Sequence, residues 1–186
     1  MHKLGQLYRS MISKPDITIT AYQAKEILGD GGPLINYRIE GSLEIDSGCD
    51  WEKVVLIENC IIENLKCVMV YFQKSVTVKN CHVKDASFSF SYFVGGLIIE
   101  NCIFDSYLDF QSGGHNDVAS ISFSNNHFMN FVNFFDCWFT GELILENNTF
   151  EKGSNICSKG QLVSFDLPVR SSDDIGDLSI DNECRP

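Results

Sequence analysis

Basic side chains are scarce in this sequence. Its 186 residues include 14 lysines and arginines against 25 aspartates and glutamates, so the formal net charge is −11. Proteins that bind nucleic-acid phosphates need clustered Lys and Arg side chains to displace the counterions. The charge balance therefore argues against nucleic acid as a partner.

Long apolar runs are lacking as well. The first residues, MHKLGQLYRSMISKPD, contain no apolar core like that of a secretory signal, and no later run approaches the ~18 residues that a membrane-spanning helix needs. We therefore expect a soluble, cytoplasmic protein with no membrane contact. A content of 44% hydrophobic residues in a chain of this length favours a single folded unit with one core.

Familiar motifs of catalysis and cofactor binding are missing too. The sequence has no paired CxxC, no GxSxG, no phosphate-binding P-loop and no GxGxxG after a strand. It therefore predicts no cofactor and no metal site, and an enzyme is the less favoured interpretation.

What the sequence does contain is an internal repeat. Six phrases align on an asparagine: LINYRI, IENCII, VKNCHV, IENCIF, FSNNHF and LENNTF, with Asn36, Asn59, Asn80, Asn101, Asn125 and Asn147. Alternating apolar residues precede each asparagine, follow it, and recur about seven to nine residues later, which indicates strands with one buried face. Three short strands per ~22 residues predict an all-β solenoid, a parallel β-helix of about six coils over residues 34–157.

The repeated phrase resembles the coil of right-handed parallel β-helices of the pectate-lyase-like superfamily. In that superfamily an asparagine at the turn between two strands stacks into a ladder along the solenoid. The C-x-F steps in NCIF and DCWF also resemble those of pentapeptide-repeat proteins, although intervals of 21 to 24 residues do not fit a multiple of five. Neither family implies one particular activity.

The asparagine and the residue after it suit a tight corner. Asparagine tolerates the left-handed backbone conformation, and its amide can bond to the asparagine of the coil above or below. The next residue is Cys60, Cys81 or Cys102 in three coils, and we predict that these thiols form a buried interior ladder, because free cysteine packs as a small apolar side chain. Disulfides and metal binding are the less favoured alternatives.

The two ends of the chain differ from the repeats. Residues 1–33 are predicted to form a helical cap: Thr20 and Gln23 make a capping-box signature, which predicts a helix at 21–28, and a second helix is predicted at 3–12. The acidic segment 158–186 is interpreted as a tail, or as a degenerate seventh coil around Asn182 in LSIDNEC.

Outward-facing aliphatic residues provide the leading hypothesis for function. Leu56, Ile98 and Ile144 belong to one outward row, and Ile61 and Ile103 lie on the next face. Such a flat face is either covered by the chain's own tail or offered to a partner. We expect a non-catalytic structural or protein-interaction module that contacts a protein partner or a second copy of itself.

Two alternatives stay open. The resemblance to pectate-lyase-like proteins implies polysaccharide binding or cleavage; Asp109 and Asn133, with His115 and Asp117 of the Gly-rich loop QSGGHNDVA, are weak catalytic candidates, and the plain interpretation of the loop is a solvated turn. The outward row of the third strand is predicted as Glu44, Met69, Ser89, Asp109 and Asn133. Its two carboxylates would stand roughly 14 Å apart, too far for a glycosidase pair.

The acidity and the resemblance to pentapeptide-repeat proteins suggest, as a second alternative, an inhibitor that mimics DNA.

Overall fold

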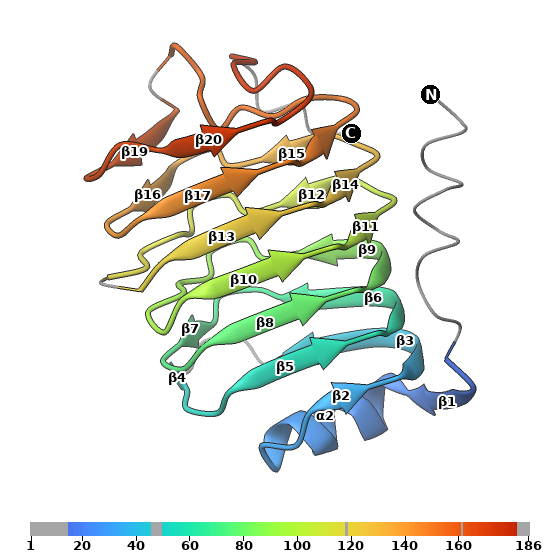
Figure 1. Ribbon diagram of the computed structural model, residues 1–186. Coiled ribbons are helices and arrows are strands. Elements are labelled where there is room, and N and C mark those ends of the chain that lie inside the picture. Colours follow the sequence, from blue (N-terminus) through green and yellow to red (C-terminus); the bar gives the residue numbers. More distant parts are fainter. Residues whose placement is uncertain (1–14, 46–49, 118, 161, 182–186) are drawn as a thin grey trace.

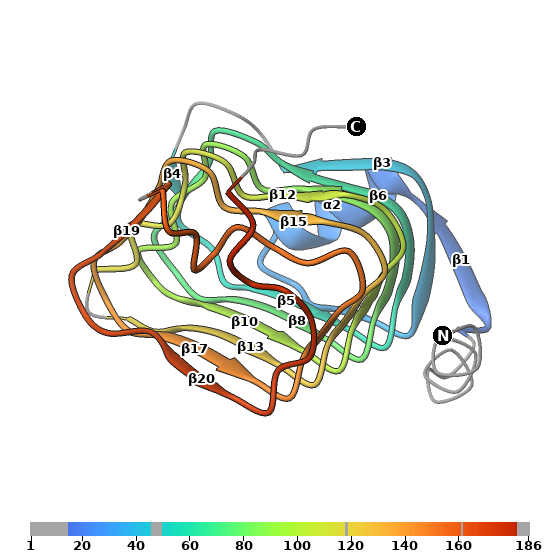
Figure 2. The same ribbon diagram turned by 90° about the horizontal axis from the view of Figure 1, so that it is seen from above.

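The computed structural model describes residues 15–45, 50–117, 119–160 and 162–181, which form a parallel β-solenoid with one short helix among them. All of its strand pairs are parallel, and each strand pairs with its counterpart one coil above or below (Figure 1). Each coil has three sides, which we name the front sheet, the back sheet and the third side (Figure 2). The predicted fold class is confirmed.

The front sheet contains the strand that precedes each corner asparagine. Its seven strands are, in spatial order, β2 (Leu34–Ile35), β5 (Val55–Glu58), β8 (Val76–Lys79), β10 (Leu97–Glu100), β13 (Ile121–Ser124), β17 (Leu143–Glu146) and β20 (Arg170–Ser172). The solenoid therefore has about seven coils rather than the six predicted. The seventh is supplied by β20, with Asp173 at its corner at a φ of 57°. Asn182, around which a seventh coil was predicted, lies outside the described residues.

The back sheet follows the corner. It consists of β1 (Ile17–Thr20), β3 (Tyr37–Ile45), β6 (Ile61–Cys67), β9 (His82–Ser87), β11 (Ile103–Phe104), β14 (His127–Phe128) and β18 (Thr149–Phe150), with β12 (Leu108–Asp109) and β15 (Val132–Asn133) attached. The third side holds two strand pairs, β4 (Asp50–Trp51) with β7 (Tyr71–Phe72) and β16 (Cys137–Phe139) with β19 (Val163–Phe165).

The helix α2 (Ala21–Gly29) closes the open end of the first coil (Figure 1). The Thr20 hydroxyl accepts a hydrogen bond from the amide of Gln23, and the Gln23 side chain accepts one from the amide of Thr20, as in a capping box. Ala24 and Leu28 are buried against the core. The helix predicted at 21–28 is thus confirmed, whereas the helix predicted at 3–12 falls outside the described residues.

Stacked phenylalanines fill the interior. Phe110 stacks on Phe88 below and Phe134 above, each at a ring-centroid distance of 5.0 Å. Phe128 stacks in the same way between Phe104 and Phe150. Because identical positions in successive coils lie one above another, the repeat itself brings these rings into contact. The alternation read from the sequence therefore determines the packing as well as the strands.

The third strand of the coil differs from its prediction. Strand register aligns Glu44 with Lys66, Ser87, Asp109 and Asn133. Met69 and Ser89 are therefore not in this row. The apolar runs VMV and FSF mislead because they straddle a second corner, at which Met69 and Phe90 adopt φ values of 56° and 59°.

Candidate functional site

All six aligned asparagines lie at left-handed corners. Their φ values run from 51° at Asn80 to 61° at Asn36. Side chains in this backbone region are strained unless the residue is glycine, or an asparagine or aspartate that bonds locally. The asparagine recurs because each corner between the front and back sheets needs a residue that tolerates positive φ.

The hydrogen-bonded ladder, however, is not made by these six amides. Only one side-chain bond joins two of them, from Asn147 Nδ2 to Asn125 Oδ1 at 2.6 Å. The buried ladder lies one residue later: Asn126 Nδ2 donates to Asn148 Oδ1 at 3.0 Å, and Asn148 Nδ2 donates to Asp174 Oδ1 at 2.8 Å. The reason is that the residue after the corner points into the interior, where backbone groups cannot reach water and need partners.

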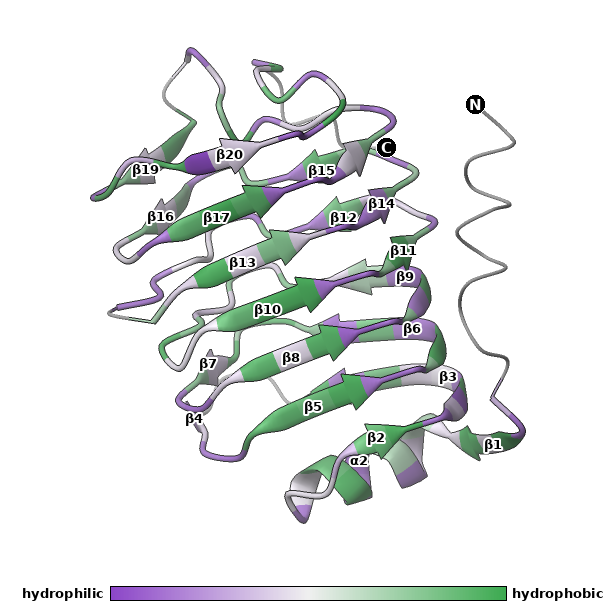
Figure 3. Cartoon of the chain, viewed as in Figure 1, coloured by the Kyte–Doolittle hydropathy of each residue, from purple (hydrophilic) through white to green (hydrophobic). Residues whose placement is uncertain are grey.

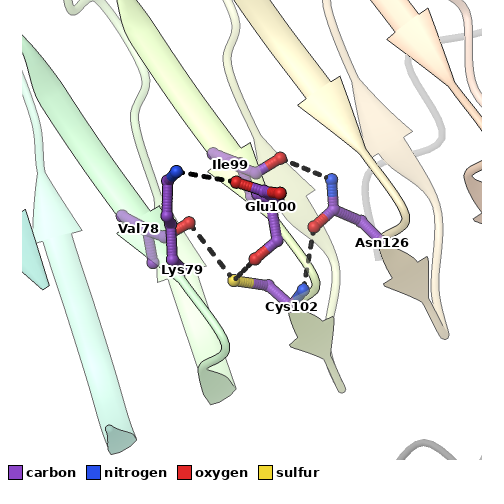
Figure 4. Close-up of polar contacts among 6 residues, drawn as sticks. All are labelled: Val78, Lys79, Ile99, Glu100, Cys102 and Asn126. Carbon is purple, nitrogen blue, oxygen red and sulfur yellow. Dashed lines mark hydrogen bonds and ion pairs between the residues drawn. The ribbon is translucent and has the colours of Figure 1, made fainter. Parts of the chain in front are cut away.

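The three cysteines occupy this same interior column below Asn126. Cys60, Cys81 and Cys102 are fully buried, as the sequence predicts. Figure 4 shows the transition: the amide of Cys102 donates to Asn126 Oδ1 at 2.9 Å, while its Sγ lies 3.4 Å from the carbonyl oxygen of Val78. Burial raises the pKa of the Cys81 thiol, so it stays protonated and unreactive.

The row of aliphatic side chains on the front sheet is present as predicted. Register aligns Leu56 with Thr77, Ile98, Ser122 and Ile144. Ile98 is 37% exposed, and Leu56 and Ile144 are half-buried. Lys79 pairs with Glu100 at 2.8 Å beside the row, and Arg170, which continues the row above Ile144, pairs with Glu142 at 2.6 Å. In Figure 3 the same strands are apolar along most of their length and polar at their ends.

Ile103 does not belong to an accessible face. It is 1% exposed, whereas Ile61 in the same row of the back sheet is half-buried. Beside it, His82 Nε2 bonds to Asp105 Oδ2 at 2.8 Å, from one coil to the next. His127, the next residue of the row, is fully buried and bonds to Glu151. Neither Ile103 nor His127 is therefore accessible on this part of the back sheet.

Asp109 lines a groove on the back sheet. The groove has a volume of about 450 Å³ and is lined by Asp85, Ala86, Ser87, Ser106, Tyr107, Asp109 and Asn130. Asp109 accepts hydrogen bonds from Asn133 Nδ2 at 2.9 Å and from the amide of Gln111 at 3.0 Å. Lys66 lies in the same row and pairs with Glu44 at 3.8 Å, so the row contains a lysine that the predicted register left out.

The other two catalytic candidates lie elsewhere. Ser112, at a φ of 55°, turns the chain away from the back sheet after Asp109. Beyond this corner the His115 ring packs against Tyr92 and Trp138 on the third side, and the amide of Asp117 donates to Thr140 Oγ1. The structure therefore brings Asp109 and Asn133 together but does not bring His115 or Asp117 to them. No group of three His, Cys, Asp or Glu side chains suited to a metal ion occurs in the described part of the chain.

An aromatic row on the third side was missed by the sequence analysis. Tyr71, Tyr92 and Trp138 stand one above another with His115 between the last two. A signal for it exists, because the pairs YF at 71 and 92 and WF at 138 each put the first ring outward and the next inward.

Comparison with known proteins finds no matching family model, no matching curated protein and no matching solved structure. None of the described helical residues forms a segment long and apolar enough to cross a membrane. The surfaces of the solenoid are therefore the basis for any assignment of function.

Proposed function

We propose that this protein is a non-catalytic, cytoplasmic interaction module whose front sheet binds a different protein. The observation that supports it is the outward row of Leu56, Ile98 and Ile144 on a regular parallel sheet. Apolar side chains at the centre and ion pairs at the margin, such as Lys79 with Glu100, match the core and rim of protein interfaces. A β-helix related to the pectate-lyase-like superfamily is the finer interpretation of its corner asparagines.

Charge favours a different protein over a second copy. Two copies would each carry a formal charge of −11, which disfavours their approach. The separation of Asp109 from His115 supports binding rather than catalysis, because general acid–base chemistry needs its groups within hydrogen-bond reach of one substrate. The DNA-mimic alternative has less support, since the front row consists of aliphatic and hydroxyl side chains with Arg170 at its end and contains no carboxylate.

The test is a binding measurement with a matched control. A double variant, Ile98→Asp with Ile144→Asp, places two charges in the row while leaving the core intact. The control, Ile17→Asp with Ile175→Asp, makes the same change at two exposed isoleucines outside the front sheet. A partner recovered from the native host and then purified should bind wild type and the control with equal affinity. It should not bind the double variant. Equal binding of all three proteins, or no partner at all, would refute the proposal.

The groove at Asp109 supports a second candidate, glycan binding. Its lining combines carboxylates, hydroxyls and the Tyr107 ring, which are the groups that orient a polar ligand in a pocket. A glycan-binding screen would compare wild type with Asp109→Ala, and with Glu44→Ala as a control on the same row outside the groove. Binding that disappears only in Asp109→Ala supports this function, and an absence of binding to every glycan removes it.

A further inference from the structure

The rings of the third side form a continuous column at the surface, exposed at Tyr71 and Trp138 and half-buried at Tyr92 and His115. β-bridges join Tyr71 to Tyr92, Tyr92 to Gly114 and Gly114 to Trp138, so these positions lie one coil apart. Ring centroids are 4.6 Å apart between Tyr71 and Tyr92, 4.1 Å between Tyr92 and His115, and 5.3 Å between His115 and Trp138. We name these four residues the aromatic column; it runs along the edge where β4 and β19 lie in Figure 2.

The column is not needed to fill the core. The neighbours Phe72, Phe93 and Phe139 are buried and supply the interior rings of these coils. Tyr71 and Trp138, by contrast, are 41% and 45% exposed. Large aromatic side chains gathered on the surface mark a binding site more often than scattered apolar residues do.

The backbone around His115 is shaped to continue the column. Gly114 occupies the position in line with Tyr92 and Trp138, where an added Cβ would lie 2.5 Å from the Trp138 carbonyl oxygen. A side chain is excluded there, and the ring comes from His115 instead, at a φ of 50°. Left-handed non-glycine residues cost of order 1–3 kcal/mol, and this conformation places the imidazole between its two neighbours.

Three carboxylate side chains lie along the column. Asp50 pairs in register with Tyr71 at one end of the column. Asp166 Oδ1 accepts a hydrogen bond from Trp138 Nε1 at 2.8 Å at the other end. Asp136 flanks the middle: burial chiefly, together with Tyr71 and the charge of Asp136, raises the pKa of the Tyr92 phenol. Burial lowers the pKa of His115, so the column itself carries no positive charge at neutral pH.

We propose that the aromatic column binds a basic peptide segment of a partner protein, with arginine or lysine side chains on the ring faces between Asp50, Asp136 and Asp166. A cation over an aromatic face is attracted by the ring quadrupole, and the guanidinium of arginine also stacks on it. The carboxylates add charge complementarity. The site as a whole, from Asp50 to Trp138, spans four coil steps, roughly 19 Å, the length of an extended peptide of about six residues.

Ring orientation favours a cation over a sugar chain. Successive rings are inclined by 80°, 48° and 71°, so they offer no common plane on which a chain of sugar rings could lie. A cation needs the face of one ring at a time, and tilted rings present several such faces. This site is independent of the front sheet, so the two proposals can fail separately.

The experiment uses fluorescence anisotropy with a short labelled peptide of alternating arginine and serine, titrated with the full chain at low salt. Tyr71→Leu with Trp138→Leu keeps apolar bulk but removes two ring faces, and should weaken binding by about tenfold or more. Asp136→Asn with Asp166→Asn should weaken it by a similar factor. Glu26→Gln with Glu40→Gln, two exposed acids away from the column, removes the same charge and should change binding less than about twofold.

Three outcomes overturn the proposal. If the leucine variant binds as tightly as wild type, the rings take no part. If the remote charge variant loses as much as Asp136→Asn with Asp166→Asn, the peptide binds only through the net charge. A wild-type protein that ignores the peptide but binds a neutral oligosaccharide, with loss in the leucine variant, would assign the column to glycans instead. Circular dichroism of each variant checks that it is folded.

Discussion

The side-chain amide of Asn126 donates to the side-chain oxygen of Asn148, one coil above, at 3.0 Å. Asn126 also donates to the carbonyl oxygen of Ile99 at 2.8 Å and accepts from the amide of Cys102 at 2.9 Å (Figure 4). One buried side chain thus connects three coils. Asn126 thus joins the buried cysteines Cys60, Cys81 and Cys102 below it to the side-chain amide of Asn148 above it in one interior column.

Replacing Asn126 should therefore destabilise the solenoid strongly. Asn126→Leu removes the hydrogen-bond partner of the buried Cys102 amide, of the Ile99 carbonyl and of the Asn148 side chain. We therefore expect a loss of about 2–4 kcal/mol in the free energy of unfolding. Asn130→Leu is the control, because this asparagine is exposed, and should cost less than about 1 kcal/mol. Urea unfolding measures both. Equal losses would show that the buried ladder contributes little.

Asn101 should tolerate change only where the left-handed backbone is kept. Its φ is 54°, and its side chain is exposed. Asn101→Gly should change the free energy of unfolding by less than about 0.5 kcal/mol, since glycine adopts positive φ freely. Asn101→Val should cost about 1–2 kcal/mol, because a β-branched residue is strained there. The same urea titrations test this, and a loss on substitution by glycine as large as by valine would point to the side chain instead.

The interior thiols should resist modification in the folded protein. Among the described cysteines, Cys157 is exposed, while Cys60, Cys67, Cys81, Cys102 and Cys137 are buried and free. In a background with Cys49→Ser and Cys184→Ser, a thiol reagent should label Cys157 in the folded protein and the other five only after unfolding. Partial burial raises the pKa of Cys157, so its labelling should be slower than that of a fully solvated thiol. Rapid labelling of Cys60, Cys81 or Cys102 in the native state would contradict the inward register of the corner.

Stability should fall in alkaline solution. Burial raises the pKa of Cys67, Cys81 and Cys137, so these thiols keep their protons in the folded state, whereas in the unfolded chain they titrate near pH 8.5. Below that pH both states hold the proton, and stability is unaffected. Above it only the unfolded state releases protons, so each such thiol lowers the free energy of unfolding by about 1.4 kcal/mol per pH unit.

Urea unfolding from pH 7.5 to 10 measures this slope. Cys67→Ala removes one of the titrating thiols and should reduce the steepness by about one proton's worth, even though the cavity lowers the absolute stability. A variant slope equal to that of wild type would mean that Cys67 does not differ in pKa between the folded and unfolded states.

The sequence predicts local structure correctly where residues close together in the chain determine it. The helix at Ala21–Gly29 depends on Thr20 and Gln23, three residues apart, and the left-handed corners depend on the conformational tolerance of single asparagines. The sequence-based predictions are wrong where the stacking of one coil on the next determines the structure. Met69 and Phe90 have an apolar pattern typical of a strand. The coil nevertheless turns at them, because strands β6 and β9 pair with each other only up to Lys66 and Ser87.

By itself, then, the sequence determined the period, the class of fold, the capping helix, the corners and the inward cysteines, because each follows from alternation or from the preference of one residue. Tertiary structure alone decided that Asn126 and not Asn125 carries the buried ladder, that Ile103 is covered, and that Tyr71, Tyr92, His115 and Trp138 meet. Such contacts join residues more than 20 positions apart, and their register depends on the exact length of every coil between them. A change of one residue in a single coil moves a side chain from one face to the other, and only the stacked molecule settles which face it occupies.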